Sequence, residues 1–266
     1  MSGWGPQRRR AAVSVTFDNL GEAAALERGE QRGDEPLGRH FSVTRALPRV
    51  LGALGEAGLR ATFFVEGLNA DLYPDTLRGL AADGHEVACH GWRHEPWGGL
   101  EPAAERELLE RSVERLDGLG LRPLGFRPPG GALTPATPAL LRELGFRYCS
   151  PAGDTVSQAG GLAVLPFRWP LLDAFHYLPH FGDMRADVLG SAEELPPARL
   201  REAVAGALAD LARDGGHLTL LFHPFLVQPG ERLDAIRAAL AGVRSLVDDG
   251  TAWCAPCRDV AAAMLR

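Results

Sequence analysis

The sequence predicts a single α/β domain with a mostly parallel sheet that closes, or nearly closes, into a barrel. Short apolar runs alternate with longer amphipathic stretches, which is typical of successive strand–helix units. The 266 residues suffice for one large domain, and no change in composition marks a second one. We expect residues 1–10 to form a flexible N-terminus and residues 11–266 to form the barrel.

The expected elements follow in chain order. The strands are short and apolar: Ala12–Phe17, Ala61–Val65, Glu86–Cys89, Leu124–Phe126, Tyr148–Cys149, Ala163–Pro166, Leu218–Phe222 and Thr251–Cys254. The helices are amphipathic, and several begin at Pro and end near Gly: Thr44–Glu56, Pro74–Asp83, Pro102–Leu119, Pro138–Leu144, Pro197–Arg213, Arg232–Asp248 and Arg258–Leu265. Two segments, Leu20–His40 and Trp169–Ala192, interrupt the alternation, and we expect them to be long loops that border one mouth of the barrel.

The composition is that of an ordinary globular protein, with 45% hydrophobic and 23% charged residues. A net charge of −6 gives no reason to expect nucleic-acid or anionic-membrane binding. No apolar stretch has the length of a signal-peptide core or a membrane span, so we expect a cytoplasmic protein with reduced thiols. Cys254 and Cys257 have redox or metal spacing, but without a second pair a strand–helix junction is the favoured interpretation.

Two histidines, His90 and His94, follow directly on the expected strand Glu86–Cys89. If the backbone there makes a helical turn, both imidazoles project from one face and can bind one metal ion. Neutral imidazole is a good ligand for zinc and other first-row metals. The pair alone is weak evidence for a metal site. It follows the end of a strand, however, and the active sites of α/β sheets and barrels lie at the carboxyl ends of their strands.

Further polar residues stand just past other strands: Asp18, Arg127, Trp169, Asp173 and His223. In a parallel barrel these strand ends converge on one face, so the side chains would meet the two histidines in one cleft. Each also has a structural interpretation. Asp18 would cap the next segment, Arg127 would pair with a surface acid, His223 would be a satisfied half-buried histidine, and Trp169 would serve packing. Their joint occurrence at successive strand ends favours a site.

An ordered set of motifs then gives a resemblance. The set comprises Thr-Phe-Asp-Asn at 16–19, Ala-Thr-Phe-Phe-Val at 61–65, Gly-His-Glu-Val at 84–87, His-Gly-Trp-Arg-His at 90–94, Arg-Pro-Pro-Gly at 127–130 and Leu-Phe-His at 221–223. It resembles the polysaccharide deacetylase superfamily, the family 4 carbohydrate esterases, over about residues 13–224. The allantoinase-like, cyclic-imide-hydrolase-like and deformylase-like branch is the most similar. The resemblance implies a distorted (β/α)7-type barrel.

The resemblance also implies roles for individual residues. Asp18 corresponds to the general base that activates water at a metal ion, and Arg127 to the arginine that orients this base. His90 and His94 correspond to the metal ligands. His223 corresponds to the general acid that protonates the leaving amine, and Asp173 to the carboxylate that steadies it. The substrate-binding residues, of which the first three would line the acyl pocket, would be Phe17, Trp169, Leu221, Pro129 and Gly130.

Amide hydrolysis requires this set of groups for chemical reasons as well. An amide is a poor electrophile with a poor leaving group. A divalent ion polarises the carbonyl and acidifies water, a base removes a proton, and an acid delivers one to nitrogen. An arginine beside Asp18 would keep the carboxylate ionised.

One residue departs from the pattern of the family, in which a second Asp after the base is the third metal ligand. Asn19 stands there in this chain. An amide oxygen carries no charge and binds borderline ions poorly. Three outcomes are open: Asn19 is a weaker neutral ligand, a carboxylate from Leu20–His40 replaces it with Glu22 nearest, or the metal is absent. The expected metal is Zn²⁺, with Co²⁺, Ni²⁺ or Mn²⁺ as alternatives.

The functional hypothesis is a metal-dependent hydrolase of a carbon–nitrogen bond that deacetylates or deformylates an N-acyl sugar or a small metabolite. Its partner would be a small-molecule or oligosaccharide N-acyl substrate, and the resemblance implies possible homo-oligomers. A hydrolase of cyclic amides or imides, in the manner of allantoinase, is the alternative. A catalytically altered binding protein is a third hypothesis, and it rests on Asn19 alone.

Overall fold

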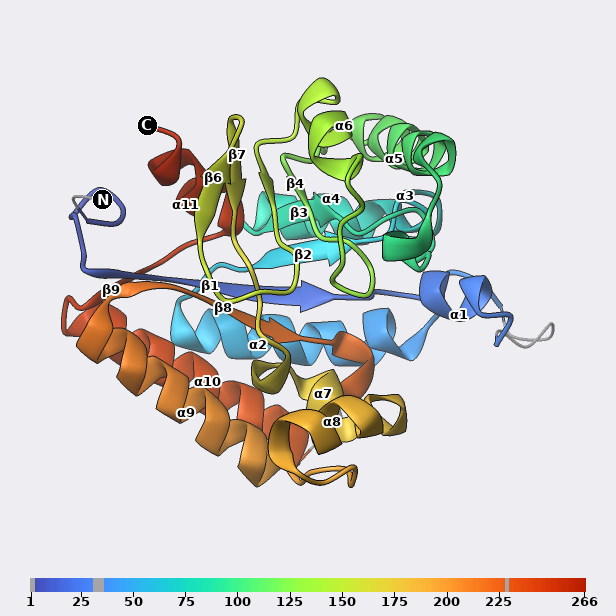
Figure 1. Ribbon diagram of the computed structural model, residues 1–266. Helices are drawn as coiled ribbons and strands as arrows, with labels where there is room; N and C mark the ends of the chain where they lie inside the picture. Colours follow the sequence, from blue (N-terminus) through green and yellow to red (C-terminus); the bar gives the residue numbers. More distant parts are fainter. Residues whose placement is uncertain (1–2, 31–35, 228–229) are drawn as a thin grey trace.

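A strongly curled sheet organises the chain, as the computed structural model shows for residues 3–30, 36–227 and 230–266 (Figure 1). Its strands are β1 (Ala11–Asp18), β2 (Thr62–Val65), β3 (Glu86–Cys89), β4 (Gly125–Phe126), β5 (Tyr148–Cys149), β6 (Ser157–Ala159), β7 (Leu162–Val164), β8 (Gly216–Phe222) and β9 (Ala252–Cys254). The order in space is β6-β7-β5-β4-β3-β2-β1-β8, and β9 pairs with β1. Every pairing is parallel except that of β6 with β7.

Single bridges complete the curl of the sheet. After β7 the chain continues beside β5, where Ala152 pairs with Phe167, and then reaches the far edge, where Leu172 pairs with Leu221 of β8. The first and last parts of the sheet are therefore joined at the end where the parallel strands finish. The prediction of one α/β domain built as a distorted barrel is confirmed.

Helices cover the outside of the sheet, with α9 and α10 side by side below it in Figure 1. The helices that correspond to the predicted ones are α2 (Leu47–Ala57), α4 (Pro74–Ala82), α5 (Pro102–Asp117), α6 (Thr137–Glu143), α9 (Pro197–Asp214), α10 (Glu231–Asp248) and, at one end of the barrel, α11 (Cys257–Met264). Each overlaps a predicted helix, because its apolar residues recur along one face. No helix among the described residues is long and apolar enough to cross a membrane.

Alternation along the strands creates two apolar regions, one on each face of the sheet. The outer region packs Val13, Val15 and Phe17 of β1 beneath the surrounding helices. The inner region fills the barrel and includes Phe64 and Tyr148. Polar residues lie at the carboxyl ends of β1, β2, β3, β4, β5 and β8, and these residues form the site described below.

Helix α11 closes the end of the barrel opposite the site. Its apolar side chains belong to the inner region, together with Trp4. Glu86 accepts hydrogen bonds from the Arg258 amide at 2.9 Å and from the Tyr148 hydroxyl at 3.0 Å, which tie the start of the helix to the barrel wall. Trp4 also pairs with Arg9, so the described part of the segment expected to be flexible, residues 3–10, folds back on itself.

Cys254 and Cys257 lie at the strand–helix junction that the sequence analysis favoured. Cys254 ends β9, Cys257 begins α11, and neither forms a disulfide. Burial raises the pKa of both thiols to about 12. Because the thiolate is the reactive form of cysteine, a redox or metal role has no support here.

The expectation that Trp169–Ala192 is a long loop is wrong. The segment folds into η3 (Trp169–Leu171), α7 (Asp173–Tyr177), η4 (Pro179–Phe181) and α8 (Gly182–Leu189). These pieces are too short to show a helical period in the sequence. Arg185, only 1% exposed, stabilises them by donating hydrogen bonds to the carbonyl groups of Phe175, Leu178 and Ala192.

The segment Leu20–His40 also contains a short helix, α1 (Ala23–Glu27), which follows the carboxyl end of β1 in Figure 1. Further helical turns that the sequence analysis missed or placed inside longer helices are η1 (Ser42–Ala46), α3 (Asn69–Leu72), η2 (Trp97–Gly99) and η5 (Pro224–Leu226). Residues 31–35 of this expected loop lie outside the described part of the chain.

Candidate active site

A buried ion pair joins the ends of β1 and β4. Asp18 is the last residue of β1, and Arg127 follows β4. Arg127 Nη1 donates to Asp18 Oδ1 at 2.6 Å, and the exposed fractions of the two residues are 3% and 0%. Arg127 also donates to Thr16 Oγ1 at 2.9 Å and from Nη2 to Ser150 Oγ at 2.9 Å, and its guanidinium lies over the ring of Phe64. Together with Asp18, these neighbours fix one orientation of the guanidinium.

Two opposing effects act on the Asp18 carboxyl group. Burial raises its pKa and is the larger effect, while the charge and hydrogen bond of Arg127 lower it. The net result is a pKa above the usual value of an aspartate. A carboxylate that gains proton affinity in this way is a better general base than one in water.

His90 presents a free ring nitrogen beside this pair. Its Nδ1 lies 2.9 Å from the backbone oxygen of Arg127, and because a carbonyl only accepts hydrogen bonds, Nδ1 carries the proton. Nε2 is therefore unprotonated, and it lies 3.8 Å from Asp18 Oδ2. Burial lowers the pKa of His90 to about 3, so the ring is neutral, as metal binding requires.

His94 reaches the same place through a bent loop, since the residues between it and His90 do not form the helical turn considered above. The two rings lie 5.0 Å apart between centroids. Gly91 and His94 have φ angles of 74° and 77°, and Glu95 fixes the bend by accepting hydrogen bonds from the amides of Trp92 and Arg93 at 3.0 and 2.8 Å. Burial, followed by the neighbouring His90, lowers the pKa of His94 to about 3.

Asn19 has a buried amide oxygen at the end of β1. It directly follows Asp18, has a φ angle of 58°, and is 9% exposed. Its Oδ1 is buried without a hydrogen-bond partner among the described residues, which is uncommon for a polar atom in a native fold. Two neutral imidazoles and one unpaired amide oxygen form a donor set for a divalent ion of the zinc class.

Glu22, the expected substitute for the missing aspartate, is engaged elsewhere. Its Oε1 accepts a hydrogen bond from the Gly38 amide at 2.7 Å, and its Oε2 accepts one from the Tyr73 hydroxyl at 2.6 Å. These contacts hold the segment after α1 against α3. In the part of the chain that the structure describes, no three His, Cys, Asp or Glu side chains gather closely enough to hold a metal. Asn19 is therefore the better candidate for a third ligand.

His223 and Asp173 form a second buried pair. His223 follows β8, and its Nδ1 lies 2.6 Å from Asp173 Oδ1, while its amide donates to Asp173 Oδ2 at 2.8 Å. Burial by itself lowers the pKa of His223, but the charge and hydrogen bond of Asp173 outweigh it, and the net pKa is raised. A protonated imidazole with Nδ1 held by a carboxylate can donate its other proton from Nε2.

The predicted substrate-binding residues differ in their burial and in the face of the sheet on which they lie. Trp169 is half-buried and contacts the rings of Phe167 and Phe181, at 5.1 and 5.4 Å between centroids. Leu221 pairs with Thr16 in the register of β1 and β8, so its side chain shares the inner face of the barrel.

Two further substrate-binding predictions fall on the loop after Arg127. Pro129 is buried and lies against Gly91, where an added Cβ would come within 3.2 Å of its ring. Gly130 is exposed, with a φ angle of 75°.

Phe17 does not belong with these residues. It alternates with Asp18 along β1, so its ring lies on the outer face, stacked on Phe63 at 5.1 Å and close to Phe222. We therefore do not retain Phe17 as a residue that lines an acyl pocket.

Sequence reasoning missed three residues that contribute to the site: Ser150, Glu95 and Glu66. Ser150 accepts hydrogen bonds from Arg127, and Glu95 shapes the histidine loop. Glu66 is the first residue after β2, so the same inspection of strand ends that found Asp18 and His90 would have found it. Burial, with smaller contributions from the charges of Asp18 and Glu95, raises the pKa of Glu66 well above its usual value.

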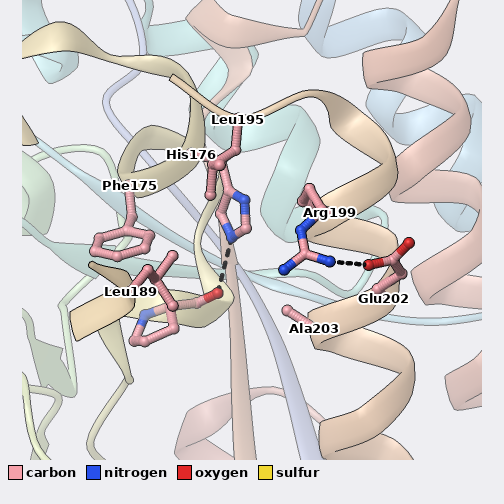
Figure 2. A pocket seen from close by; sticks show the side chains of 8 residues that line it. Phe175, His176, Leu189, Leu195, Arg199, Glu202 and Ala203 are labelled. Carbon is pink, nitrogen blue, oxygen red and sulfur yellow. Dashed lines mark hydrogen bonds and ion pairs between the residues drawn. The ribbon is translucent and has the colours of Figure 1, made fainter. Parts of the chain in front are cut away.

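A cavity of about 280 Å³ lies between α7 and α9, beside the helix that begins with Asp173 (Figure 2). Its lining is largely apolar and includes Pro170, Phe175, Leu189 and Leu195. His176 donates from Nε2 to the Pro170 carbonyl at 2.9 Å, a bond that Figure 2 shows. This contact ties α7 to the turn that carries Trp169, and so helps to position both Trp169 and Asp173.

Comparisons with known proteins agree with this geometry. The chain aligns with the crystal structure of a proposed polysaccharide deacetylase from Mycobacterium smegmatis with a TM-score of 0.81 and 31% identity, over 97% of this chain and 91% of that one. The structure of Puue allantoinase aligns with a TM-score of 0.75 and 20% identity, over 98% and 91% of the two chains, and so shows the shared fold.

Among curated relatives, the peptidoglycan deacetylase of Helicobacter pylori is 30% identical over 138 residues, which are 52% of this chain and 47% of that protein. The chain spans between a third and a half of the length of the curated relatives it matches first. The family model described as polysaccharide deacetylase matches residues 6–149, more than half of the chain. The chain belongs to the polysaccharide deacetylase family.

Proposed function

We propose that this protein is a metal-dependent hydrolase that removes the acyl group from an N-acyl sugar or a small N-acylated metabolite. The observation that carries the proposal is the combination of two buried pairs around two neutral imidazoles. Asp18 is oriented by Arg127, and His223 by Asp173, at the same end of the barrel. Each pair suits one half of the acid–base chemistry that amide hydrolysis requires.

The metal would be held by His90, His94 and Asn19, whose neutral nitrogens and unpaired oxygen fit it. A bound divalent ion polarises the acyl carbonyl and acidifies a water molecule. Zinc is the favoured ion, because two of the three donors are imidazoles.

The residues of the chain would handle the protons. Asp18 removes a proton from water as the water oxygen bonds to the acyl carbon. His223 then donates its Nε2 proton to the nitrogen as the carbon–nitrogen bond breaks, which gives a carboxylic acid and an amine. Arg127 prevents rotation of Asp18. Asp173 accepts a hydrogen bond from the Nδ1 proton of His223 and stabilises the imidazolium, which leaves the Nε2 proton for transfer.

Membership of the family supports an N-acetylated carbohydrate as the substrate class, as the name of the Helicobacter relative indicates for that protein. The experiment is to incubate the purified chain with Zn²⁺ or Co²⁺ and a panel of N-acetyl and N-formyl sugars, short chito-oligosaccharides and cyclic ureides. Released acetate, formate or ring-opened product is then measured.

We expect metal-stimulated release from an N-acyl sugar, and loss of that release in Asp18→Asn and His223→Ala. Release only from cyclic ureides would favour the allantoinase-like alternative. Failure of every substrate with metal-loaded protein would contradict the proposal and favour a binding protein.

A further inference from the structure

Glu66 is a buried carboxylate that the proposed reaction does not use. It is 0% exposed, although it stands at the end of β2, where the neighbouring strands present Asp18 and His90. Asn69 Nδ2 donates to its Oε2 at 2.9 Å, but its Oε1 has no hydrogen-bond partner among the described residues. Leaving a carboxylate oxygen buried and unpaired is costly, so this atom calls for an explanation.

The register of the sheet places Glu66 beside the metal-binding residues. Asp18 of β1 pairs with Phe64, and Phe64 pairs with Ala88 of β3. Because side chains alternate between faces, Glu66 and His90, each two residues further on, share the inner face of the barrel with Asp18.

The backbone after β2 is also bonded to the histidine loop. The Gly67 amide donates to the Gly91 carbonyl at 2.9 Å, and the Leu68 amide donates to the Trp92 carbonyl at 3.1 Å. Glu66 is therefore held next to the loop that carries both histidines.

The proposed metal ligands carry no charge of their own. Two are neutral imidazoles and one is an amide, while the charge of Asp18 is balanced by Arg127 at 2.6 Å. A divalent cation at this place would lack the negative charge that buried ions need nearby. The oxygens of Glu95 both accept backbone amides of its own loop. Glu66 is the neighbouring carboxylate with an unpaired oxygen.

We propose that Glu66, kept ionised by a nearby divalent cation, supplies the negative charge that the proposed ligands His90, His94 and Asn19 lack. Glu66 would stabilise the cation through its charge and would not bind it directly, because among the described residues it does not form a metal-binding group with His90 and His94. It is thus a positioning residue for a divalent cation, and Asn69 fixes its orientation. This inference rests on the proposed metal-dependent function.

The test is a double-mutant cycle that removes the carboxylate at position 66 and adds one at position 19. Binding of Co²⁺ is measured by titration calorimetry for the wild type, Glu66→Gln, Asn19→Asp and the double variant. Removal of the carboxylate should weaken binding about 10- to 100-fold, the range for groups just outside the ligand shell. Asn19→Asp alone should tighten Co²⁺ binding. The affinity of the double variant should return towards that of the wild type, because it has one carboxylate at position 19 in place of the one at position 66.

Two further variants act as controls. Glu66→Asp keeps the charge and should retain most of the affinity. Glu86→Gln removes an equally buried carboxylate from the opposite end of the barrel, and it should lower the melting temperature without changing Co²⁺ affinity. The visible spectrum of bound Co²⁺ should be the same in the wild type and in Glu66→Gln, because the ligands do not change.

The outcomes separate this inference from the proposed function. Wild-type affinity in Glu66→Gln, or a changed Co²⁺ spectrum, would overturn the role of Glu66 and leave the hydrolase proposal in place. If the wild type binds no Co²⁺ while Asn19→Asp does, both the inference and the metal dependence of the natural chain are overturned.

Discussion

Buried carboxylates of this protein differ in role because they differ in partner. Asp18 forms an ion pair with an arginine, and Asp173 accepts a hydrogen bond from an imidazole. Glu22 accepts hydrogen bonds from an amide and a hydroxyl, while one oxygen of Glu66 has no partner among the described residues. Residue type alone distinguishes none of these. The partner determines whether a carboxylate acts as a base, orients an acid, holds a loop or balances a charge.

Removal of the arginine from the buried pair should affect both stability and catalysis. Arg127→Ala leaves Asp18 buried without a counter-charge, so we expect a loss of about 3–5 kcal/mol in the free energy of unfolding. If Asp18 is the general base of the proposed reaction, its loss of orientation should lower kcat/KM about 100-fold or more. Urea denaturation and initial rates measure the two effects.

The matched control for this substitution is Arg106→Ala. Arg106 forms an exposed pair with Glu143 at 2.7 Å, and its loss should leave the free energy of unfolding almost unchanged, because water screens the pair. Equal effects of the two substitutions would contradict the role given to the buried pair.

The pH dependence of the reaction should be bell-shaped. Asp18 must be ionised, and its pKa is raised, so activity falls as the pH drops through that value. His223 must be protonated, and its pKa is also raised, so activity falls as the pH rises through that value. Asp173→Asn removes the charge that raises the pKa of His223 and should move the alkaline limb of the kcat/KM profile to lower pH. An unmoved alkaline limb would mean that another group acts as the acid.

At the scale of elements, the loop between His90 and Glu95 determines how the two proposed metal ligands lie. Its sequence spacing suits a helical turn, but the loop bends at Gly91 and His94, and Glu95 accepts two of its amides. The histidines converge all the same, because the bend brings their rings to 5.0 Å. Local spacing therefore predicted that the two rings lie together, while the conformation of the loop, fixed by contacts of Glu95, is not the helical turn that the spacing suggested.

Gly91→Ala tests this loop. The φ angle of 74° disfavours a side chain, and a Cβ would lie 2.8 Å from Glu95 Oε2 and 3.2 Å from Pro129 Cγ. We expect a loss of about 1–3 kcal/mol in stability, together with weaker Co²⁺ binding. Gly99→Ala, at a glycine with no heavy atom within 4 Å of the added Cβ, serves as the control in denaturation and calorimetry. Full metal affinity in Gly91→Ala would show that the bend does not position the histidines.

At the scale of the molecule, the candidate active site lies at one end of the barrel, and α11 closes the other end. Both chain termini lie on the side away from the arrowheads of β1 and β2 in Figure 1, where α11 packs into the barrel. Apolar residues fill the space between α11 and the buried ion pairs. The two ends should therefore respond independently to mutation.

Met264→Ala tests that independence. Met264 of α11 is 7% exposed in the inner apolar region, and its truncation should cost about 2–5 kcal/mol of stability. Co²⁺ affinity and kcat should stay at wild-type values under native conditions, because Met264 packs in the inner apolar region and is not one of the residues that form the candidate site. Leu189→Ala, at a residue 47% exposed, should change stability by about 0.5 kcal/mol or less and is the control. A fall in metal affinity with the first variant would show coupling between the ends.

The sequence by itself determined the strands, the longer helices and the chemical groups at the strand ends. Apolar periodicity reports which face of an element is buried, and a parallel sheet brings its carboxyl ends together, so Asp18, His90, Arg127 and His223 could be identified in advance. The helices between Trp169 and Ala192 could not, because they are too short for a period and depend on Arg185.

Only the tertiary structure decided which side chains face each other. It placed Phe17 in the outer apolar region and gave Glu22 hydrogen bonds to Gly38 and Tyr73. Asn19 and Glu66 each have a side-chain oxygen with no hydrogen-bond partner among the residues that the structure describes. The partners of a polar group come from segments far apart in the chain, and those partners determine its charge and role. No local pattern in the sequence contains that information.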